Sequence, residues 1–260
     1  MLVKDKVIIV AGIGPGMGVK VAQQAAASGA KVCVAARTAS YVEAMVHEIA
    51  DAGGAVIGQT VDVADEAQCQ KLAEFTLSTW GRIDGLVNNA FLHGAFIPFE
   101  QGSILEWSQV MDITCFGALR MVKAVLPAMK AQRVGSIVNV SSMGSVQPYP
   151  GGAAYATAKA ALEGATRQLA KELGQYNIRV NAPRMGRMDG VPWQNSLAMM
   201  AAQYQTTPDS IEGELHKLIA LGALPPDEDC ANAVLYLLSD YARVITGTAP
   251  DVNGGEYMAG

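Results

Sequence analysis

The feature that most constrains the fold is a glycine-rich turn between a strand-like run and a helix-like run. Residues 6–11 are rich in β-branched side chains and predict a buried strand. The segment Gly12-Ile13-Gly14-Pro15-Gly16-Met17-Gly18 follows, and residues 19–28 favour a helix that stops at Gly29. Backbone N–H groups at such a turn face an anion, and the missing side chains let a pyrophosphate come close. The sequence therefore predicts a phosphate-binding turn.

The ligand of this turn is better read as a dinucleotide than as ATP. An ATP-binding turn of this kind ends in Gly-Lys-Ser or Gly-Lys-Thr. Here Gly18 is followed by Val19 and Lys20. A glycine cluster alone is equally typical of an ordinary turn, so the flanking strand and helix carry the interpretation.

Strand-like and helix-like runs alternate along the whole chain, and half of the residues are apolar. This alternation predicts an α/β fold, a doubly wound parallel sheet of about seven strands with helices on both faces. No linker or repeat divides the chain, so we expect one domain over residues 1–260. The expected strands are 6–11, 31–36, 55–61, 84–88, 135–141, 177–182 and 247–252, and the expected helices are 16–28, 40–52, 65–80, 103–131, 153–175 and 226–239.

A second pattern carries chemistry. Tyr155 and Lys159 are four residues apart in a helix-like run, which places both side chains on one helix face, and Ser142 lies thirteen residues before Tyr155. A lysine close to a tyrosine favours the phenolate and lowers the tyrosine pKa towards neutral. Such a tyrosine exchanges a proton with an alcohol or carbonyl oxygen, and a serine hydroxyl can hold that oxygen. Tyr-x-x-x-Lys alone also occurs by chance on solvated helices.

The glycine spacing together with Ser142, Tyr155 and Lys159 resembles the short-chain dehydrogenase/reductase family, and the resemblance spans nearly the whole chain. It implies a single-domain Rossmann-like fold with both dinucleotide-binding and catalytic residues. Further matches to the family's ordered motifs lie at Asn88-Asn89-Ala90 and at residues 135–142, 178–181 and 245–255.

The resemblance implies a mechanism and an activity. Tyr155 would be the general acid in reduction and the general base in oxidation, Lys159 would lower its pKa and bind the nicotinamide ribose, and Ser142 would fix the substrate oxygen. This implies an NAD(P)-dependent alcohol dehydrogenase or ketoreductase. Enoyl reductases of the family space the tyrosine and lysine more widely, and epimerases need a longer C-terminal domain, so both are disfavoured.

The end of the second expected strand indicates the cofactor. A carboxylate there would bind the ribose 2′-OH of NAD, but Ala36 stands at this place, and Arg37 and Thr38 follow. An arginine can pair with a 2′-phosphate, although it can also stack on adenine or face solvent. We expect NADP(H), with NAD(H) possible. The cofactor contacts implied by the resemblance are Gly12, Gly14, Gly16, Met17, Gly18, Arg37, Thr38, Asp62, Val63, Asn89, Ala90, Tyr155, Lys159 and Met188.

Three departures from the family pattern suggest a divergent subgroup. Thr114 stands where the family usually has an Asn that kinks the central helix and holds a water leading to Lys159; we expect its hydroxyl to bond a carbonyl one turn back and to alter the proton relay. Phe91 replaces a glycine after Asn-Asn-Ala. After the sixth strand, Met185-Gly186 and Gly190 replace Pro-Gly and a threonine.

The substrate pocket is expected to be closed by residues 187–225, which contain many Met and aromatic side chains. Such side chains form an adaptable apolar surface, although the same spacing describes a helix packed on the core. Arg184 and Arg187 remain open as contacts to substrate, cofactor or solvent. We expect an uncharged, bulky apolar secondary alcohol or ketone. The candidate substrate contacts are Phe91, His93, Met143, Tyr149 and Trp193.

Net charge, the length of apolar runs and the distribution of cysteines limit the ligands, partners and locations that we expect for this protein. The net charge is −5 with no basic block, so nucleic acid and anionic membranes are not expected partners. No run of 18 apolar residues occurs, so we expect no membrane-spanning helix, and the mixed charges of residues 4–6 lead us to expect no secretory signal. The four cysteines are scattered, which is typical of a cytoplasmic protein, and no metal site is expected. Resemblance implies a homotetramer, or else a homodimer.

One alternative from another class stays open. A catalytically silent protein of the same fold could bind the dinucleotide as a sensor or scaffold. Thr114 and the altered turn after the sixth strand favour it, whereas the intact Ser142, Tyr155 and Lys159 favour an enzyme.

Overall fold

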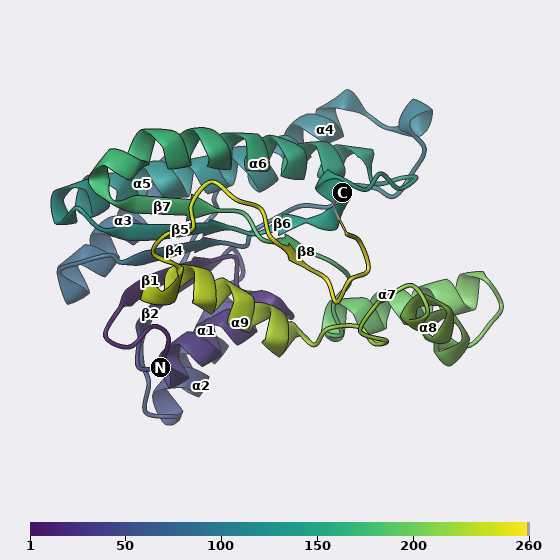
Figure 1. The fold of residues 1–260 in the computed structure, drawn as a ribbon, viewed down its shortest axis with the longest axis horizontal. Helices are drawn as coiled ribbons and strands as arrows, with labels where there is room; N and C mark the ends of the chain where they lie inside the picture. Colours follow the sequence, from purple (N-terminus) through teal and green to yellow (C-terminus); the bar gives the residue numbers. More distant parts are fainter. Residues whose placement is uncertain (259–260) are drawn as a thin grey trace.

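A six-stranded parallel sheet forms the middle layer of the molecule (Figure 1). The computed structural model describes residues 1–258, apart from the side chain of Gln203. The strand order is β3-β2-β1-β4-β5-β7, so the order reverses between β1 and β4, where dinucleotides bind in sheets of this type. The strands are β1 (Val7–Ala11), β2 (Lys31–Ala36), β3 (Ala55–Thr60), β4 (Gly85–Asn88), β5 (Gly135–Asn139) and β7 (Ile178–Asn181).

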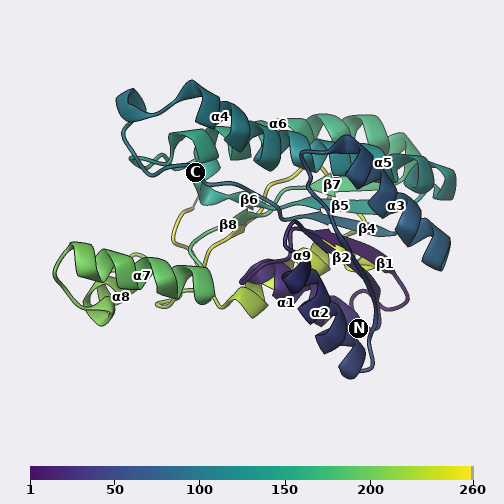
Figure 2. The same ribbon diagram turned by 180° about the vertical axis from the view of Figure 1, so that it is seen from behind.

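Helices cover both faces of this sheet (Figures 1 and 2). Successive strand residues point to opposite faces, so Ile8 and Val10 join one apolar core and Ile9 joins the other. The first core lies under α1 (Met17–Ala27), α2 (Ala39–Asp51) and α9 (Asp227–Leu238). The second lies under α3 (Glu66–Trp80), α5 (Gly117–Gln132) and α6 (Ala153–Leu173). The expected doubly wound α/β fold is confirmed.

The helix expected over residues 103–131 is not one regular helix. It begins as α4 (Ile104–Met111), passes through a π-helical turn, η2 (Asp112–Phe116), and continues as α5. One extra residue per turn at this place rotates α5 relative to α4, and π-helical turns are frequent at functional sites. Short 3₁₀ turns are η1 (Phe99–Gln101), η3 (Met143–Ser145), η4 (Gly174–Tyr176) and η5 (Asp240–Ala242).

The chain continues beyond β5 and β7 into a second, smaller parallel sheet of three strands. It consists of β6 (Ser141–Ser142), β8 (Arg184–Met185) and β9 (Asp251–Val252). The seventh strand expected at 247–252 runs beside β7, where Gly247 N donates to Val180 O over 2.8 Å. It is regular only at β9, because Pro250 lacks an N–H and Gly247 has a φ of 73°.

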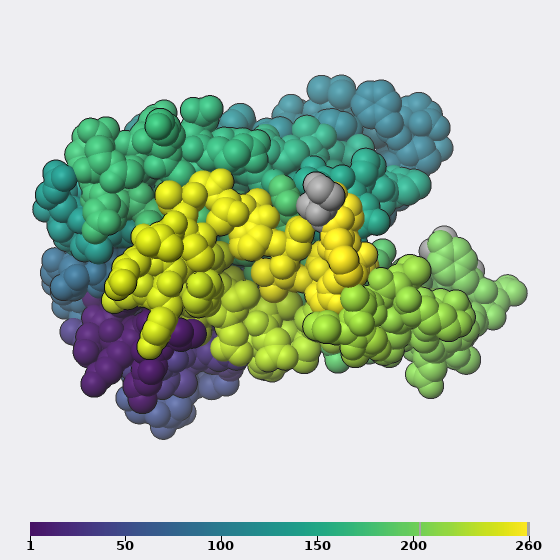
Figure 3. Space-filling model, in the orientation of Figure 1, coloured from purple at the N-terminus to yellow at the C-terminus, as the bar shows by residue number. Residues whose placement is uncertain are grey.

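The segment 187–225 forms an arm at one end of the molecule (Figures 1 and 2). It contains α7 (Val191–Gln203) and α8 (Pro208–His216). Leu197 and Ile219 are buried within it, whereas Met199 and Tyr204 are exposed. Figure 3 shows a notch between this arm and the part of the molecule above it. Some of the apolar residues therefore pack the arm itself, and others are free to meet a ligand.

Within residues 1–258, no helix combines the length and the apolarity that crossing a membrane requires. The four cysteines, Cys33, Cys69, Cys115 and Cys230, are buried and unpaired.

Candidate active site

The glycines of the N-terminal turn are required by the packing of β1 against the segment after β4. Gly12 has a φ of 101°, and a Cβ there would lie 2.2 Å from Ala90 N. A Cβ on Gly18 would lie 2.5 Å from Gly12 O. Asn89 Nδ2 donates to Gly12 O over 2.7 Å and fixes the two turns together. Gly12, Gly18, Asn89 and Ala90 thus form one rigid platform.

Gly14 and Gly16 differ from these packed glycines. A Cβ on Gly14 would meet no atom within 4 Å, so the space in front of this residue is open. No side chain caps α1 at Gly16, and the first turn of α1 carries no acidic residue. The N-terminus of α1 is open on the side of Gly14, whereas a Cβ on Gly16 would lie 3.3 Å from Pro192 and 3.7 Å from Asp227 Oδ2. The open side at Gly14 fits the pyrophosphate of a dinucleotide.

The residues expected near the adenosine lie at the ends of β2 and β3. Arg37 and Thr38 are exposed. Asp62 is half-buried, and its Oδ1 accepts from Ala64 N over 2.9 Å, which orients the carboxylate. Val63 is 7% exposed and its side chain faces α5, where a Cβ on Gly117 would lie 2.6 Å from it. A cofactor contact at Val63 would therefore use its backbone.

Met17 and Met188, also expected at the cofactor, belong to the core under α1 and α9. Met17 is 4% exposed, and Met188 is half-buried against the same core. Their contact with a cofactor stays a prediction.

Tyr155 and Lys159 lie on one face of α6, as their spacing predicts. They are 8% and 1% exposed, and Lys159 Nζ is 5.6 Å from the centre of the Tyr155 ring. Lys159 Nζ donates to Val140 O over 2.6 Å, which anchors it to the segment after β5. Ser142, on β6, lies close enough to Tyr155 to lower the pKa of its phenol, and its Oγ accepts from Gly144 N over 3.2 Å. The structure thus brings the three residues together.

Burial changes the electrostatics expected from the sequence. Desolvation raises the pKa of the Tyr155 phenol above its ordinary value, and the nearby Ser142 hydroxyl only partly opposes this. Desolvation also lowers the pKa of Lys159 from 10.5 to about 7, with Cys115 and Glu163 acting in the opposite direction. Lys159 therefore does not, from the protein's own groups, lower the tyrosine pKa towards neutral. The expectation of an acidified phenol is wrong for this arrangement.

The buried Lys159 should titrate near neutrality. We expect its side chain to lose its proton at a pH of about 7, whereas exposed lysines keep theirs to about pH 10. An unfolded chain keeps this proton up to 10.5, so the contribution of Lys159 to stability rises with pH between 7 and 10.5. NMR of protein labelled at the lysine side chains measures the titration, and Lys159→Arg assigns the signal. A Lys159 signal titrating near 10.5 would contradict the burial argument.

Thr114 does not make the hydrogen bond that its sequence position suggested. Its side chain is fully buried in η2, and the hydroxyl accepts from Leu92 N over 3.0 Å and donates to Leu92 O over 3.3 Å. The loop after β4 supplies both partners, so no carbonyl one turn back is needed. Thr114 fixes this loop to the π-helical turn, and a catalytic role for it stays a prediction.

Aromatic side chains gather beside Tyr155. The ring centres of Phe91 and His93 lie 5.8 Å and 4.5 Å from that of Tyr155. Desolvation, and then the charge of Lys159, lower the pKa of His93, so the imidazole is neutral at pH 7. Phe96 joins this cluster, with its ring 6.3 Å from His93 and stacked 5.8 Å from Tyr149. Phe96 could not be identified from the sequence, because no motif distinguishes one aromatic residue among several in a loop.

The ring of Tyr149 packs against a glycine on each side. A Cβ on Gly152 would lie 1.9 Å from its ring and one on Gly144 would lie 2.8 Å from it. The Tyr149 ring is therefore wedged between the turn after Ser142 and the start of α6. Of the other expected substrate contacts, Met143 directly follows Ser142, and Trp193 lies on α7. Both are half-buried, and their contact with a substrate stays a prediction.

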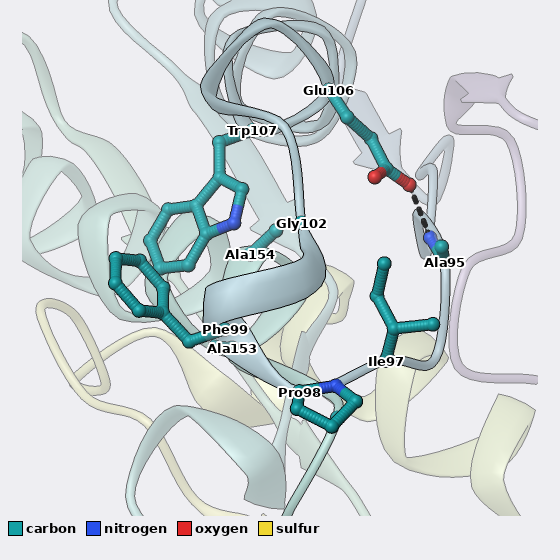
Figure 4. A pocket seen from close by; sticks show the side chains of 10 residues that line it. Ala95, Ile97, Pro98, Phe99, Gly102, Glu106, Trp107, Ala153 and Ala154 are labelled. Carbon is teal, nitrogen blue, oxygen red and sulfur yellow. Dashed lines mark hydrogen bonds between the residues drawn. The ribbon is translucent and has the colours of Figure 1, made fainter.

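The loop that carries the aromatic cluster is fixed to α4. Glu106 accepts a hydrogen bond from Ala95 N (Figure 4). The Phe99 ring packs edge-on against Trp107, with ring centres 5.6 Å apart. The cavity left between loop and helices measures about 10 Å³, room for one water molecule. The loop is therefore supported by α4 on one side.

Neither arginine near the site is available for a substrate carboxylate. Arg184 binds Glu163 and lies 3.6 Å from Asp251, and Arg187 binds Glu256. Contacts to substrate, cofactor or solvent were the partners left open for these residues, and the structure shows both arginines in ion pairs within the protein.

Comparison with known proteins identifies the family. The chain matches the family model described as Enoyl-(Acyl carrier protein) reductase over residues 12–256. It is 30% identical to levodione reductase of Leifsonia aquatica over 98% of this chain and 95% of that protein. The chain belongs to the short-chain dehydrogenase/reductase family. The family resemblance expected from the sequence is confirmed.

Other relatives within this family span the same length. A 3-oxoacyl-(acyl-carrier-protein) reductase, FabG of Thermotoga maritima, is 31% identical over 98% of this chain and 99% of its own. Among solved structures, NAD⁺-bound xylitol dehydrogenase matches with a TM-score of 0.90 and 28% identity, over 97% of this chain and 99% of its own. A variant of actinorhodin polyketide ketoreductase with NADPH matches with a TM-score of 0.90 and 26% identity, over 97% of each chain.

Proposed function

We propose that this protein is an NADP(H)-dependent oxidoreductase that interconverts an uncharged, bulky apolar ketone and its secondary alcohol. The observation that carries the proposal is the buried Tyr155, which lies close to Ser142 and is flanked by the rings of Phe91 and His93. A proton donor, a hydroxyl for the substrate oxygen and an apolar wall are the parts that ketone reduction needs.

Each side chain of the site has a distinct task in the reaction. When bound, the nicotinamide dinucleotide supplies or accepts the hydride. Gly14 and the N-terminus of α1 hold its pyrophosphate. Ser142 donates a hydrogen bond to the substrate oxygen, and Tyr155 delivers a proton to the same oxygen in reduction and removes it in oxidation.

Burial keeps Tyr155 protonated at neutral pH, which is the form that donates a proton in reduction. The same burial makes the phenol a weaker acid than one that titrates near neutrality. Lys159 Nζ lies 5.6 Å from the centre of the Tyr155 ring, and its charged form, which predominates only below about pH 7, would stabilise the phenolate that forms. Val140 O holds the Lys159 side chain in place.

Arg37 supports NADP(H) as the cofactor. It is exposed beside Thr38 at the carboxyl end of β2, and the preceding Ala36 offers no carboxylate for a ribose hydroxyl. Among the solved relatives, the ketoreductase holds NADPH and the xylitol dehydrogenase holds NAD⁺, so the family accommodates both.

Introducing a carboxylate should reverse this preference. In Ala36→Asp, the new side chain would bond the 2′-OH of NADH and repel the 2′-phosphate of NADPH. We expect the ratio of kcat/KM for NADPH to that for NADH to fall by about a hundredfold, equivalent to about 2.8 kcal/mol. Arg37→Ala is the companion variant, expected to weaken NADPH alone. A wild-type enzyme that prefers NADH would contradict the reading of Arg37 and leave the mechanism unchanged.

Several observations support the substrate class. The wall beside Tyr155 is aromatic, and the two arginines nearby are occupied by Glu163 and Glu256. The relatives named for their activities include a levodione reductase and a 3-oxoacyl-(acyl-carrier-protein) reductase. Oxidation of NADPH in the presence of bulky cyclic and aromatic ketones tests the proposal, with acyl thioesters as the competing class.

The silent sensor remains the alternative. A raised tyrosine pKa and the loss of the family's central asparagine at Thr114 favour it. A sensor binds the dinucleotide but transfers no hydride to any ketone, so turnover separates the two functions.

A further inference from the structure

A buried carboxylate lies on the same face of α6 as the two catalytic residues. Glu163 follows Tyr155 and Lys159 at intervals of four residues, and it is 3% exposed. Its Oε1 accepts hydrogen bonds from Ser141 Oγ over 2.7 Å and from Ser145 Oγ. Burial alone would raise the pKa of Glu163, but hydrogen bonds from Arg184, Ser145 and Ser141 lower it, so the carboxylate is ionised at neutral pH.

Glu163 also joins α6 to the small sheet. Arg184 donates to Glu163 through Nε over 3.0 Å and through Nη2 over 2.8 Å, in a two-pronged contact. Arg184 Nη1 then lies 3.6 Å from Asp251 Oδ1. Ser141, Arg184 and Asp251 come from β6, β8 and β9, so every strand of the small sheet contributes one residue to this cluster.

The two serines bound by Glu163 flank the catalytic serine. Ser141 precedes Ser142 directly, and Ser145 ends the 3₁₀ turn that follows it. Within that turn, Gly144 N donates to Ser142 Oγ, so the Ser142 hydroxyl moves with the turn. Glu163 therefore holds the backbone on both sides of Ser142 against the helix that carries Tyr155.

We infer that Glu163 is a positioning residue, which fixes the Ser142 hydroxyl relative to Tyr155 through its contacts with Ser141 and Ser145. The expected loss of turnover rests on the proposed function, whereas the expected change in hydrogen exchange does not. Stability does not explain such a cluster well, because an apolar pair of the same volume is often as stable as a buried ion pair. A fixed geometry does explain it, since small displacements of reacting groups cost rate.

The test removes the two serine hydroxyls and leaves the Glu163–Arg184 ion pair in place. Glu163→Ala would leave the buried charge of Arg184 without its partner and could unfold the protein. In Ser141→Ala/Ser145→Ala, we expect kcat for ketone reduction to fall about tenfold or more. The Kd for NADPH should stay within about twofold, because the phosphate turn is untouched. Ser145→Thr keeps a hydroxyl and should lose less rate than Ser145→Ala.

Hydrogen exchange gives a readout that does not depend on turnover. We expect faster exchange of the amides of Gly144, Val146 and Gln147 in the double variant, since the first bonds Ser142 Oγ and the others bond Met143 O. A wild-type protein without turnover would refute the proposed function, and the exchange rates would still decide the positioning role. If the double variant had the same exchange rates and the same kcat as the wild type, the positioning role of Glu163 would be refuted.

A buried carboxylate elsewhere provides the control. Asp84 is 7% exposed and accepts from Arg82 and from Val7 N at the amino end of the sheet. Asp84→Asn should lower Tm without changing kcat. If the serine variant behaved in the same way, with Tm lowered and kcat intact, Glu163 would be a structural residue only.

Discussion

Replacing Tyr155 by phenylalanine is expected to lower kcat for ketone reduction by about 10³-fold, which is in the middle of the usual range for a general acid. The change removes one hydroxyl and keeps the ring, which packs 5.8 Å from Phe91 and 4.5 Å from His93. Because the residue is 8% exposed, no water replaces the lost proton donor easily. The Kd for NADPH, measured by fluorescence of the bound cofactor, should change little.

Tyr149→Phe is the matched control for this experiment. Tyr149 lies in the same aromatic group, stacked on Phe96, and its pKa is also raised by burial. We assign it to the wall of the site, so losing its hydroxyl should change kcat only a few-fold. If Tyr155→Phe kept most of the wild-type turnover, or if Tyr149→Phe lost as much as Tyr155→Phe, the assignment of the proton donor would be wrong.

Replacing Gly14 by alanine should separate cofactor binding from folding. The new Cβ meets no protein atom within 4 Å, so Tm should stay at the wild-type value. The Cβ would occupy the space assigned to the pyrophosphate, so we expect the Kd for NADPH to rise about a hundredfold, or about 2.8 kcal/mol. Calorimetry measures the Kd, and thermal unfolding without cofactor measures Tm.

Two other glycines provide controls for this result, one whose replacement should disturb folding and one whose replacement should change neither Tm nor the Kd. Gly12→Ala places a Cβ 2.2 Å from Ala90 N at a φ of 101°, so it should lower Tm strongly. Gly174→Ala meets open space far from the turn and should change neither quantity. If Gly14→Ala bound NADPH as wild type does, the cofactor would not lie in front of Gly14, and the phosphate site would have to be sought elsewhere.

The sheet could be predicted from the sequence because each strand is a short apolar run bounded by turns. All six strands of the main sheet lie within or at the edges of the expected runs. The family's kinked helix pointed to Thr114, but the π-helical turn of η2 (Asp112–Phe116) could not be predicted, because the Leu92 backbone that Thr114 binds comes from another segment. The arm gave no clear helix bounds, because its apolar residues serve partly its own packing and partly an exposed face.

The candidate site was predictable where spacing alone determines geometry. Tyr155 and Lys159 share a face because they are one helical turn apart. Gly12 and Gly18 belong to a recognisable glycine motif, and the structure shows that neighbouring backbone atoms leave no space for a Cβ at either position. Burial could not be read from the same pattern, and burial raises the pKa of Tyr155 and lowers that of Lys159. The partners of Thr114 and Glu163 come from segments distant in the chain, so their contacts required the structure.

Transfer of deuterium from NADPH deuterated at C4 to a bulky cyclic ketone tests the proposed reaction most directly. With wild-type protein, we predict that the alcohol product carries one deuterium from one face of the nicotinamide, and that Tyr155→Phe forms almost none. Mass spectrometry of the alcohol measures this label. Tight binding of NADPH without labelled product from any ketone would contradict the proposed reductase and would leave the silent sensor as the function of this site.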